Sequence, residues 1–250
     1  MKAAAAFVFL VVAATAAWAA LREDGQTLRD PAAPVPRSSF QPEGDGWTLI
    51  RTSFSVRIEH REILFTPLGP SKGRRFPRPA RLELVTLTRG AVDLTEGSSV
   101  PAFLNGGALV VTRGPVIESH AGTDAGLETS WAFAARPAGE GDIIIRIRVH
   151  GEVVARVAGD GLHFFDPRRE AGLDIRTPEW TDARGTKSAI IAACERGVIE
   201  VRLPSALVDA SAYPATLAWR LRPDAAAARV APGPRLSRPL RRAGGRAARE

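Results

Sequence analysis

The sequence predicts an all-β protein, an antiparallel β-sandwich of about a dozen short strands. Three observations predict it. Apolar residues recur at every second position in run after run, which is the period of a half-buried strand. Turn residues separate these runs at spacings of about ten residues, as in sandwiches and barrels. Beyond the first residues, no segment has a convincing amphipathic helical pattern.

The N-terminus predicts export. Met1-Lys2 supplies a short positive region, residues 3–15 are apolar, and Ala17-Trp18-Ala19 fits a small-x-small cleavage site. An apolar run of about 13 residues is too short to span the bilayer, which favours a signal peptide at residues 1–19 over a short membrane anchor. We therefore expect a secreted or cell-envelope protein, in the periplasm, on the outer surface or outside the cell, without a transmembrane segment after cleavage.

Charge is distributed unevenly along the chain. The 250 residues carry a formal net charge of +7, and residues 222–250 hold eight arginines against Asp224 and Glu250. Lys2 accounts for one more positive charge, so residues 20–221 balance to zero. This balance argues against a basic nucleic-acid-binding domain and predicts no specific nucleic-acid partner. We expect only a weak electrostatic contact between the C-terminal tail and anionic surfaces.

Composition divides the chain into four parts. Residues 20–46 are rich in proline and predict a linker, whereas residues 47–221 predict the β-sandwich domain, which could divide into two sub-sheets near residue 120. Residues 222–250 are rich in Arg, Ala and Pro and predict a disordered tail. The single cysteine, Cys194, allows no internal disulfide and is expected to be buried as a small apolar residue.

The strands can be justified in order. Residues 54–58 and 63–65 predict a strand, a turn and a strand, and the four prolines of residues 67–79 predict an exposed loop. In residues 82–87 the apolar parity changes, which predicts a bulge or a strand buried on both faces. Residues 108–112 and 116–119 flank the turn dipeptide Gly114-Pro115.

The second half contains the clearest alternation. In residues 145–149 the apolar side chains point one way and the arginines the other, which predicts one dry and one wet face. His150-Gly151 could form a tight hairpin into residues 153–157. Residues 199–203 follow a turn at 195–197 whose glycine can adopt positive φ, and residues 217–221 end the pattern.

Four segments together resemble the β-rich modules found near the N-termini of large exported proteins of myxobacteria and similar GC-rich Gram-negative bacteria. They are AGLETSWAFAARPAGEGDIIIRIRVHG (125–151), GLHFFD (161–166), PEWTDARGT (178–186) and SAYPATL (211–217). The resemblance implies a non-catalytic domain with a largely uncharacterised partner. The family usually continues Asp-Pro after the last segment, whereas here an Arg/Ala/Pro run follows, so we expect a solitary module.

Residues that could carry chemistry are scattered. The histidines show no HExxH or His-x-His spacing, and no serine lies in a Gly-x-Ser-x-Gly elbow, so we expect no metal and no cofactor. Four carboxylates could pair across strands as in glycosidases, although exposure at strand ends is the default for such residues. The histidines are His60, His120, His150 and His163, and the carboxylates are Glu118, Glu128, Glu179 and Asp182.

The best ligand-binding candidates gather around one tryptophan. Trp180 stands beside a polar turn and could form a flat platform that stacks on sugar rings, with Asp182, Arg184 and Trp131 as further candidates. Trp47, like Trp131, is open to both the core and the platform interpretation.

Three function classes follow. The first is a non-catalytic structural or adhesive module at the cell exterior. The second is a module that binds carbohydrate or a surface polymer, with an extracellular polysaccharide or a cell-surface component as its partner. The third is a sugar-acting enzyme, which would need two or more carboxylates and a histidine in one cleft.

Overall fold

The computed structural model describes residues 39–68, 79–97, 99–151, 154–158, 160–166 and 171–223. All of them belong to one compact unit, Arg37–Glu250. The predicted signal peptide, most of the predicted linker, most of the predicted loop at 67–79 and residues 224–250 lie outside the described residues. Within the described residues the chain forms nineteen strands and one short helix, α2 (Ser205–Ala210), which confirms the all-β fold class.

The first sheet has nine strands in the order β1-β2-β3-β4-β5-β11-β18-β17, with β6 paired to β5. Its strands are β1 (Gln41–Glu43), β2 (Gly46–Ile50), β3 (Phe54–Glu59), β4 (Glu62–Pro67), β5 (Ala80–Arg89), β6 (Val92–Asp93), β11 (Ile143–His150), β17 (Ala192–Glu195) and β18 (Val198–Leu203). The described pairings in this sheet are all antiparallel.

The second sheet has ten strands in the order β12-β13-β14-β19-β10-β9-β8-β7, with β15 paired to both β19 and β16. Its strands are β7 (Ser99–Asn105), β8 (Ala108–Arg113), β9 (Val116–Thr123), β10 (Gly126–Phe133), β12 (Val154–Ala158), β13 (Gly161–Asp166), β14 (Ala171–Arg176), β15 (Glu179–Thr181), β16 (Lys187–Ala189) and β19 (Ala215–Pro223). Its described pairings are antiparallel as well.

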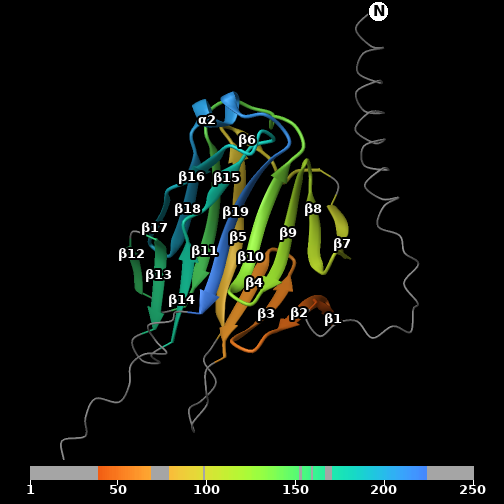
Figure 1. The fold of residues 1–250 in the computed structure, drawn as a ribbon, viewed down its shortest axis with the longest axis vertical. Coiled ribbons are helices and arrows are strands. Elements are labelled where there is room, and N and C mark those ends of the chain that lie inside the picture. Colours follow the sequence, from red (N-terminus) through yellow and green to blue (C-terminus); the bar gives the residue numbers. More distant parts are fainter. Residues whose placement is uncertain are drawn as a thin grey trace, which may run out of the picture. The chain divides into compact units, whose positions relative to one another are not determined.

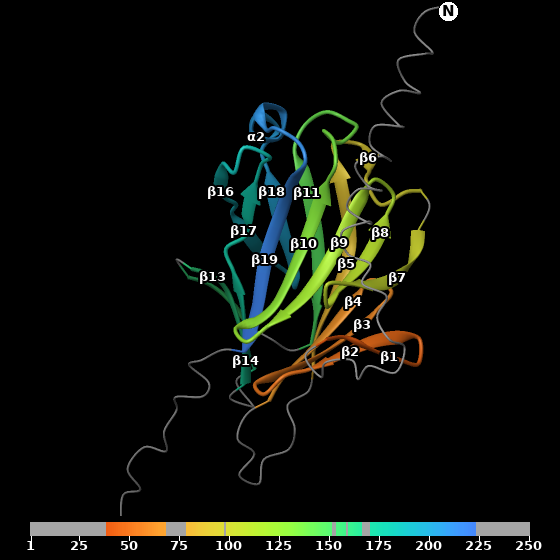
Figure 2. The same cartoon turned by 45° about the vertical axis from the view of Figure 1, so that its right-hand side comes forward.

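The two sheets stack on each other (Figures 1 and 2), and their inner faces form one hydrophobic core. Alternation forms this core: in β11, Ile145, Ile147 and Val149 are buried, while the intervening Arg146 and Arg148 point outward. On the wet face Arg146 pairs with Glu200 of β18 at 2.9 Å. The prediction of one dry and one wet face is confirmed.

The parity change in β5 is a bulge. Arg146 of β11 is opposite Thr86 and the next residue, Ile147, is opposite Leu84, so Val85 has no partner in the register. The extra residue returns Leu87 to the inner face, where it is fully buried. The bulge interpretation is confirmed, and Gly114-Pro115 also forms the predicted turn, between β8 and β9.

The predicted boundaries of the domain are wrong at both ends. Phe40 is fully buried and β1 pairs with β2, so residues 39–46 belong to the fold and not to the linker. β1 escaped prediction because three residues show no alternation, and its Pro42 is tolerated on an edge strand. At the other end β19 extends to Pro223, two residues past the predicted limit. The strand count also exceeds the dozen expected, since other two- and three-residue strands escape in the same way.

A division near residue 120 is also wrong, because that position lies within β9. The chain first changes sheet between β6 and β7, and it crosses again on both sides of β11. This crossing overturns the predicted hairpin at His150-Gly151: β11 pairs with β5 and β18, whereas β12 pairs with β13 in the other sheet. The two segments are close in sequence, but they belong to opposite layers.

One end of the sandwich is closed by α2, which lies at the top of Figure 1. A buried guanidinium holds this end together: Arg89 at the end of β5 donates to the carbonyl of Pro137 at 2.8 Å and forms an ion pair with Asp209 of the helix. The exposed Arg136 also pairs with Asp209, at 2.6 Å. None of the described helices is long and apolar enough to cross a membrane.

Candidate functional site

Trp180 is not a surface platform. Its side chain is only 1% exposed and packs against Phe133 and Tyr213, with ring centroids 5.6 and 6.5 Å away. Its Nε1 donates to Ser211 Oγ at 2.8 Å. The prediction fails because β15 pairs with β19, which places Trp180 opposite the core residue Leu217 instead of beside solvent.

Trp131 is also a core residue. It lies in β10, 1% exposed, and its ring packs against Trp219 with centroids 5.5 Å apart. Both predicted aromatic ligand candidates therefore serve the core, whereas Trp47 borders open space.

Asp182 and Arg184 do lie together, but they organise a turn. The Asp182 carboxylate accepts hydrogen bonds from the backbone N–H groups of Arg184 and Thr186, each at 2.9 Å, and from Nε of Arg184 at 3.0 Å. Burial would raise the pKa of Asp182, but these donors outweigh it and lower the pKa to about 2. Arg184 also donates to the carbonyl of Ala210 at 2.9 Å, so the pair fastens this turn to the end of α2.

The predicted glycosidase-type carboxylates each have their own partner. Glu128 pairs with Arg220 at 2.5 Å and Glu179 pairs with Lys187 at 2.8 Å, both on the surface. Asp182 lies in the turn described above, and Glu118 is buried between the sheets. The histidines do not converge either, and among the described residues no group of three or more His, Cys, Asp or Glu side chains could hold a metal ion.

Glu118 belongs to a polar cluster inside the sandwich. Its carboxylate forms an ion pair with Nε of Arg113, and its other oxygen lies 3.5 Å from Nε2 of His120. His120 Nδ1 lies 3.0 Å from the hydroxyl of Thr129. Burial lowers the pKa of His120, so this imidazole is neutral at physiological pH.

The order of hydroxyl, imidazole and carboxylate in this cluster resembles the parts of a catalytic triad, but the geometry does not suit that role. Thr129 is fully buried and pairs in register with His120 on one side and Trp219 on the other. A nucleophile must reach its substrate, and this hydroxyl has no path to one. The cluster instead satisfies polar groups that the inner face of β9 places between the sheets.

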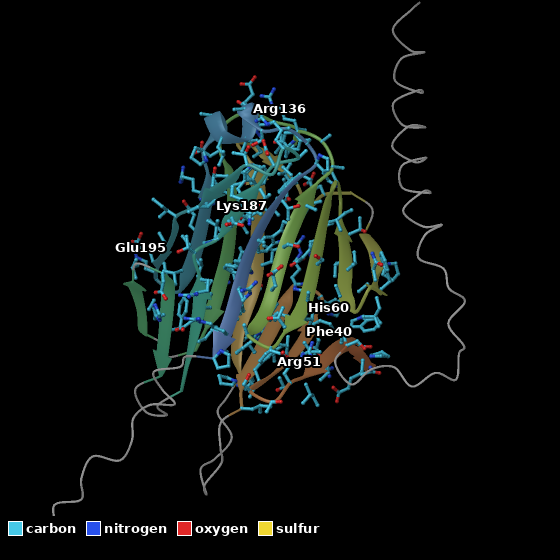
Figure 3. The ribbon with its side chains drawn as sticks, in the orientation of Figure 1. Phe40, Arg51, His60, Arg136, Lys187 and Glu195 are labelled. Atoms are coloured by element: carbon cyan, nitrogen blue, oxygen red, sulfur yellow. The ribbon has the colours of Figure 1, made fainter. Side chains whose placement is uncertain are left out.

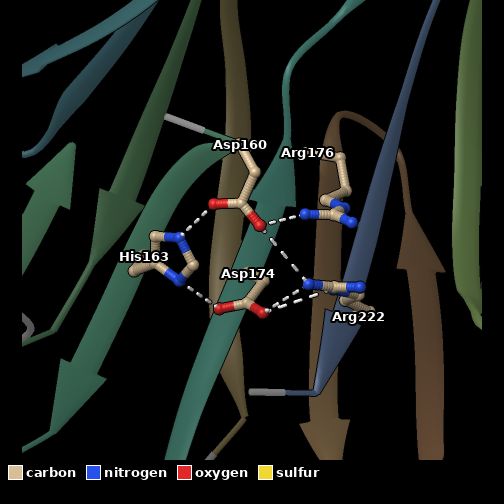
Figure 4. Close-up of polar contacts among 5 residues, drawn as sticks. All are labelled: Asp160, His163, Asp174, Arg176 and Arg222. Atoms are coloured by element: carbon tan, nitrogen blue, oxygen red, sulfur yellow. Dashed lines mark hydrogen bonds and ion pairs between the residues drawn. The ribbon is translucent and has the colours of Figure 1, made fainter. Parts of the chain in front are cut away.

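A second polar cluster lies on the outer face of the second sheet (Figure 4). His163 lies between two carboxylates: Nδ1 is 2.7 Å from Asp174 and Nε2 is 2.9 Å from Asp160. Arg176 pairs with Asp160, and Arg222 reaches Asp174 at 3.2 Å. Direct cross-strand pairing explains this row, because His163 is opposite Asp174 and Asp174 is opposite Arg222.

The His163 cluster links β13, β14 and β19 through ion pairs and hydrogen bonds. Hydrogen bonding to Asp160 and attraction to Asp174 raise the pKa of His163, while the hydrogen bond to His163 lowers the pKa of Asp160. Both ring nitrogens are occupied by carboxylates, so neither is available for a metal ion or for proton transfer to a substrate.

The remaining candidate is a groove of about 790 Å³ between the two sheets, called here the inter-sheet groove. The first sheet contributes Trp47 of β2 and Ile58 of β3, and the second contributes Leu109 and Val111 of β8. Its charged and titratable side chains are Asp45, His60, Arg61 and Arg113. Figure 3 labels His60 on the side of the sandwich that carries β8, away from Arg136 at the α2 end.

Two hydrogen-bond chains fix the border of the groove. Arg113, held by Glu118, donates to the carbonyl of His60 at 2.6 Å, where the β3–β4 turn adopts a positive φ of 49°. Arg61 donates to the Thr95 hydroxyl at 3.0 Å, and that hydroxyl donates to Asp93 at 2.7 Å. The groove therefore has a defined shape before any ligand enters.

No signal in the sequence brings these residues together. Alternation places Trp47 and Ile58 on an inner face, but no spacing in the sequence shows that β8 lies across from them. Fold and groove together define an antiparallel β-sandwich with an open groove between its layers.

Comparison with known proteins found no protein-family model that matches the chain and no curated protein that is similar to it in sequence.

Proposed function

We propose that this protein is a non-catalytic β-sandwich module, exported from the cell, with a structural or adhesive role at the cell exterior. The observation that carries the proposal is the inter-sheet groove, which combines apolar walls with polar side chains at its border. Small-molecule binding sites have this composition, and roughly 300–1,000 Å³ is their usual size.

The polar clusters support a binding role over a catalytic one. The titratable groups around His163 and around Glu118 are bonded to one another, so their hydrogen-bonding capacity is already used. In contrast, the side chains of Asp45 and His60 make no hydrogen bond or ion pair within the part of the chain that the structure describes. The N-terminal segment and the resemblance to exported bacterial modules support the location.

The test is retention of the purified mature chain on cells of the producing organism that lack the gene. Saturable retention that survives washing is the expected result, and a chain that stays entirely in the wash would contradict the adhesive role. Cell fractionation of the native protein tests export separately, and recovery in the cytoplasmic fraction alone would contradict it.

A matched pair of variants locates the contact. Pro101→Arg places a long charged side chain at an exposed position that lines the groove. Ile191→Arg makes a similar change at an exposed position just before β17, the strand at one edge of the first sheet. We expect Pro101→Arg to weaken retention and Ile191→Arg to leave it unchanged.

A further inference from the structure

One wall of the inter-sheet groove is aromatic. Trp47 is half-buried: it packs against the core and also borders the groove. Ile58, Leu109 and Val111 continue this surface across both sheets. A tryptophan fixed by the core and open on one side presents an amphipathic ring, with an apolar face and a polar N–H.

The polar atoms around this wall include both donors and acceptors. The exposed Asp45 carboxylate can only accept hydrogen bonds, and it has no partner among the described residues. Arg61 can only donate; its side-chain hydrogen bond goes to the neutral Thr95 hydroxyl, and the Asp93 carboxylate behind that hydroxyl attracts it electrostatically. His60, also exposed and without a side-chain partner in this part of the chain, can do either.

The charges of the groove are balanced. Among the side chains that line the groove, Arg113 is neutralised by Glu118, which leaves one positive group, Arg61, and one negative group, Asp45. A strongly anionic ligand would be repelled by Asp45, and a purely apolar one would leave Asp45 and Arg61 desolvated without partners. The ligand that fits is uncharged, has one flat apolar face, and carries groups that both donate and accept.

We infer that the inter-sheet groove is a binding site for a neutral saccharide, with Trp47 stacking on a sugar ring and Asp45, Arg61 and His60 bonding its hydroxyls. A sugar hydroxyl both donates and accepts, which matches a groove lined by a carboxylate and a guanidinium. This inference rests on the proposed function and names the ligand class of its groove. It also moves the predicted aromatic platform from Trp180 to Trp47.

Calorimetric titration of the intact mature chain tests the inference, with neutral hexasaccharides of glucose, xylose and mannose as probes and hexagalacturonate as the anionic comparison. We expect saturable binding of at least one neutral probe and weaker binding of hexagalacturonate. Asp45→Asn should weaken the neutral interaction by about tenfold, the effect of one hydrogen bond to a charged group. Asp45 has no described partner, so this variant should fold normally.

Trp47→Ala should abolish binding, and Trp47→Phe, which keeps a stacking ring, should retain part of it. Ile50→Ala is the matched control, because Ile50 lies on the same strand, is largely exposed and does not line the groove. A urea unfolding curve for each variant separates lost binding from lost fold.

The inference is overturned if no neutral probe binds. It is also overturned if Asp45→Asn, Trp47→Phe and Trp47→Ala all fold and all bind the neutral probe as the natural chain does. Retention on cells without saccharide binding would reject the saccharide and leave the adhesive role intact. Saccharide binding without retention on cells would support the saccharide site and reject the adhesive role.

Discussion

His163 makes the stability of this protein depend on pH. Because its pKa is raised in the folded state, the cluster stabilises the fold fully below the ordinary histidine pKa of 6.5, and that stabilisation is lost as pH rises through the raised value. Asp160 acts in the opposite direction: its pKa is lowered from 3.8, so its contribution is present above 3.8 and lost on further acidification.

We therefore predict that His163→Gln is most destabilising, relative to the natural chain, between about pH 4 and 6.5, and that the difference shrinks toward pH 9. Urea unfolding midpoints measured for both chains across this range would show it. Comparison with the variant cancels the contribution of His120, whose lowered pKa gives the opposite trend. A difference that is the same at every pH would show that protonated His163 does not stabilise the fold through Asp160 and Asp174.

Glu118 and Arg113 form the ion pair whose loss should be most costly. Their side chains are 4% and 11% exposed, so removal of one leaves the other charged in a nearly dry environment. Glu118→Leu should cost about 3–5 kcal/mol of unfolding free energy, whereas the double variant with Arg113→Met should recover part of that loss. Chemical denaturation of the single and double variants checks this, and additive losses would show that the pair does not act as a unit.

Single residues also mark the limit of sequence reasoning. The sequence pattern predicts the opposite faces of Ile145 and Arg146 correctly, because alternation is a local property of one strand. Trp180 was assigned wrongly, since the polar turn after it indicated exposure while the burial of its ring depends on Phe133, Tyr213 and the distant β19. The residues that line the groove were not predicted for the same reason: they come from segments that include the β1–β2 hairpin, the β3–β4 hairpin and β8, which are far apart in the sequence.

At the scale of elements, the β8–β9 hairpin packs closely against the segment between β6 and β7, and Gly114 makes this contact possible. This glycine has a φ of 54°, and a Cβ added there would lie 2.2 Å from the carbonyl oxygen of Glu96. The close approach brings the β8–β9 turn against the segment that leads from β6 to β7.

Gly114→Ala should thus destabilise the fold more than Gly106→Ala does. Gly106 has a similar φ of 58°, but an added Cβ would meet no heavy atom within 4 Å. Gly106→Ala should cost about 1 kcal/mol for the left-handed backbone, and Gly114→Ala a further 1–3 kcal/mol, roughly, for the steric clash. Urea unfolding of both variants measures the difference, and equal costs would mean that the Glu96 backbone can move away.

Elements were predictable where they alternate and not where they are very short. The turns at Gly114-Pro115 and at residues 195–197 carry glycine signals and were located correctly. β1, β6 and β16 have two or three residues each, too few to show a period, and each exists because the strand beside it offers an edge to pair with.

For the whole molecule, the boundary of the fold predicts the effect of truncation. Deletion of residues 224–250, which carry seven arginines against Asp224 and Glu250, should leave the unfolding midpoint unchanged and abolish salt-sensitive binding to anionic vesicles. Deletion of residues 222–250 should lower the midpoint as well, because it removes Arg222 from Asp174 and shortens β19. Equal midpoints for the two truncations, or vesicle binding that survives both, would contradict this division.

The sequence by itself determined the β-sandwich class, the positions of most strands and the face that each long strand presents to the core. These properties follow from apolar periodicity and turn residues, which depend only on residues close together in the sequence. Only the tertiary structure decided which strands share a sheet, which tryptophans are buried and which residues meet in the inter-sheet groove. Those outcomes depend on pairing between segments that are far apart in sequence, and the chain between β6 and β19 changes sheet five times in ways that no local signal encodes.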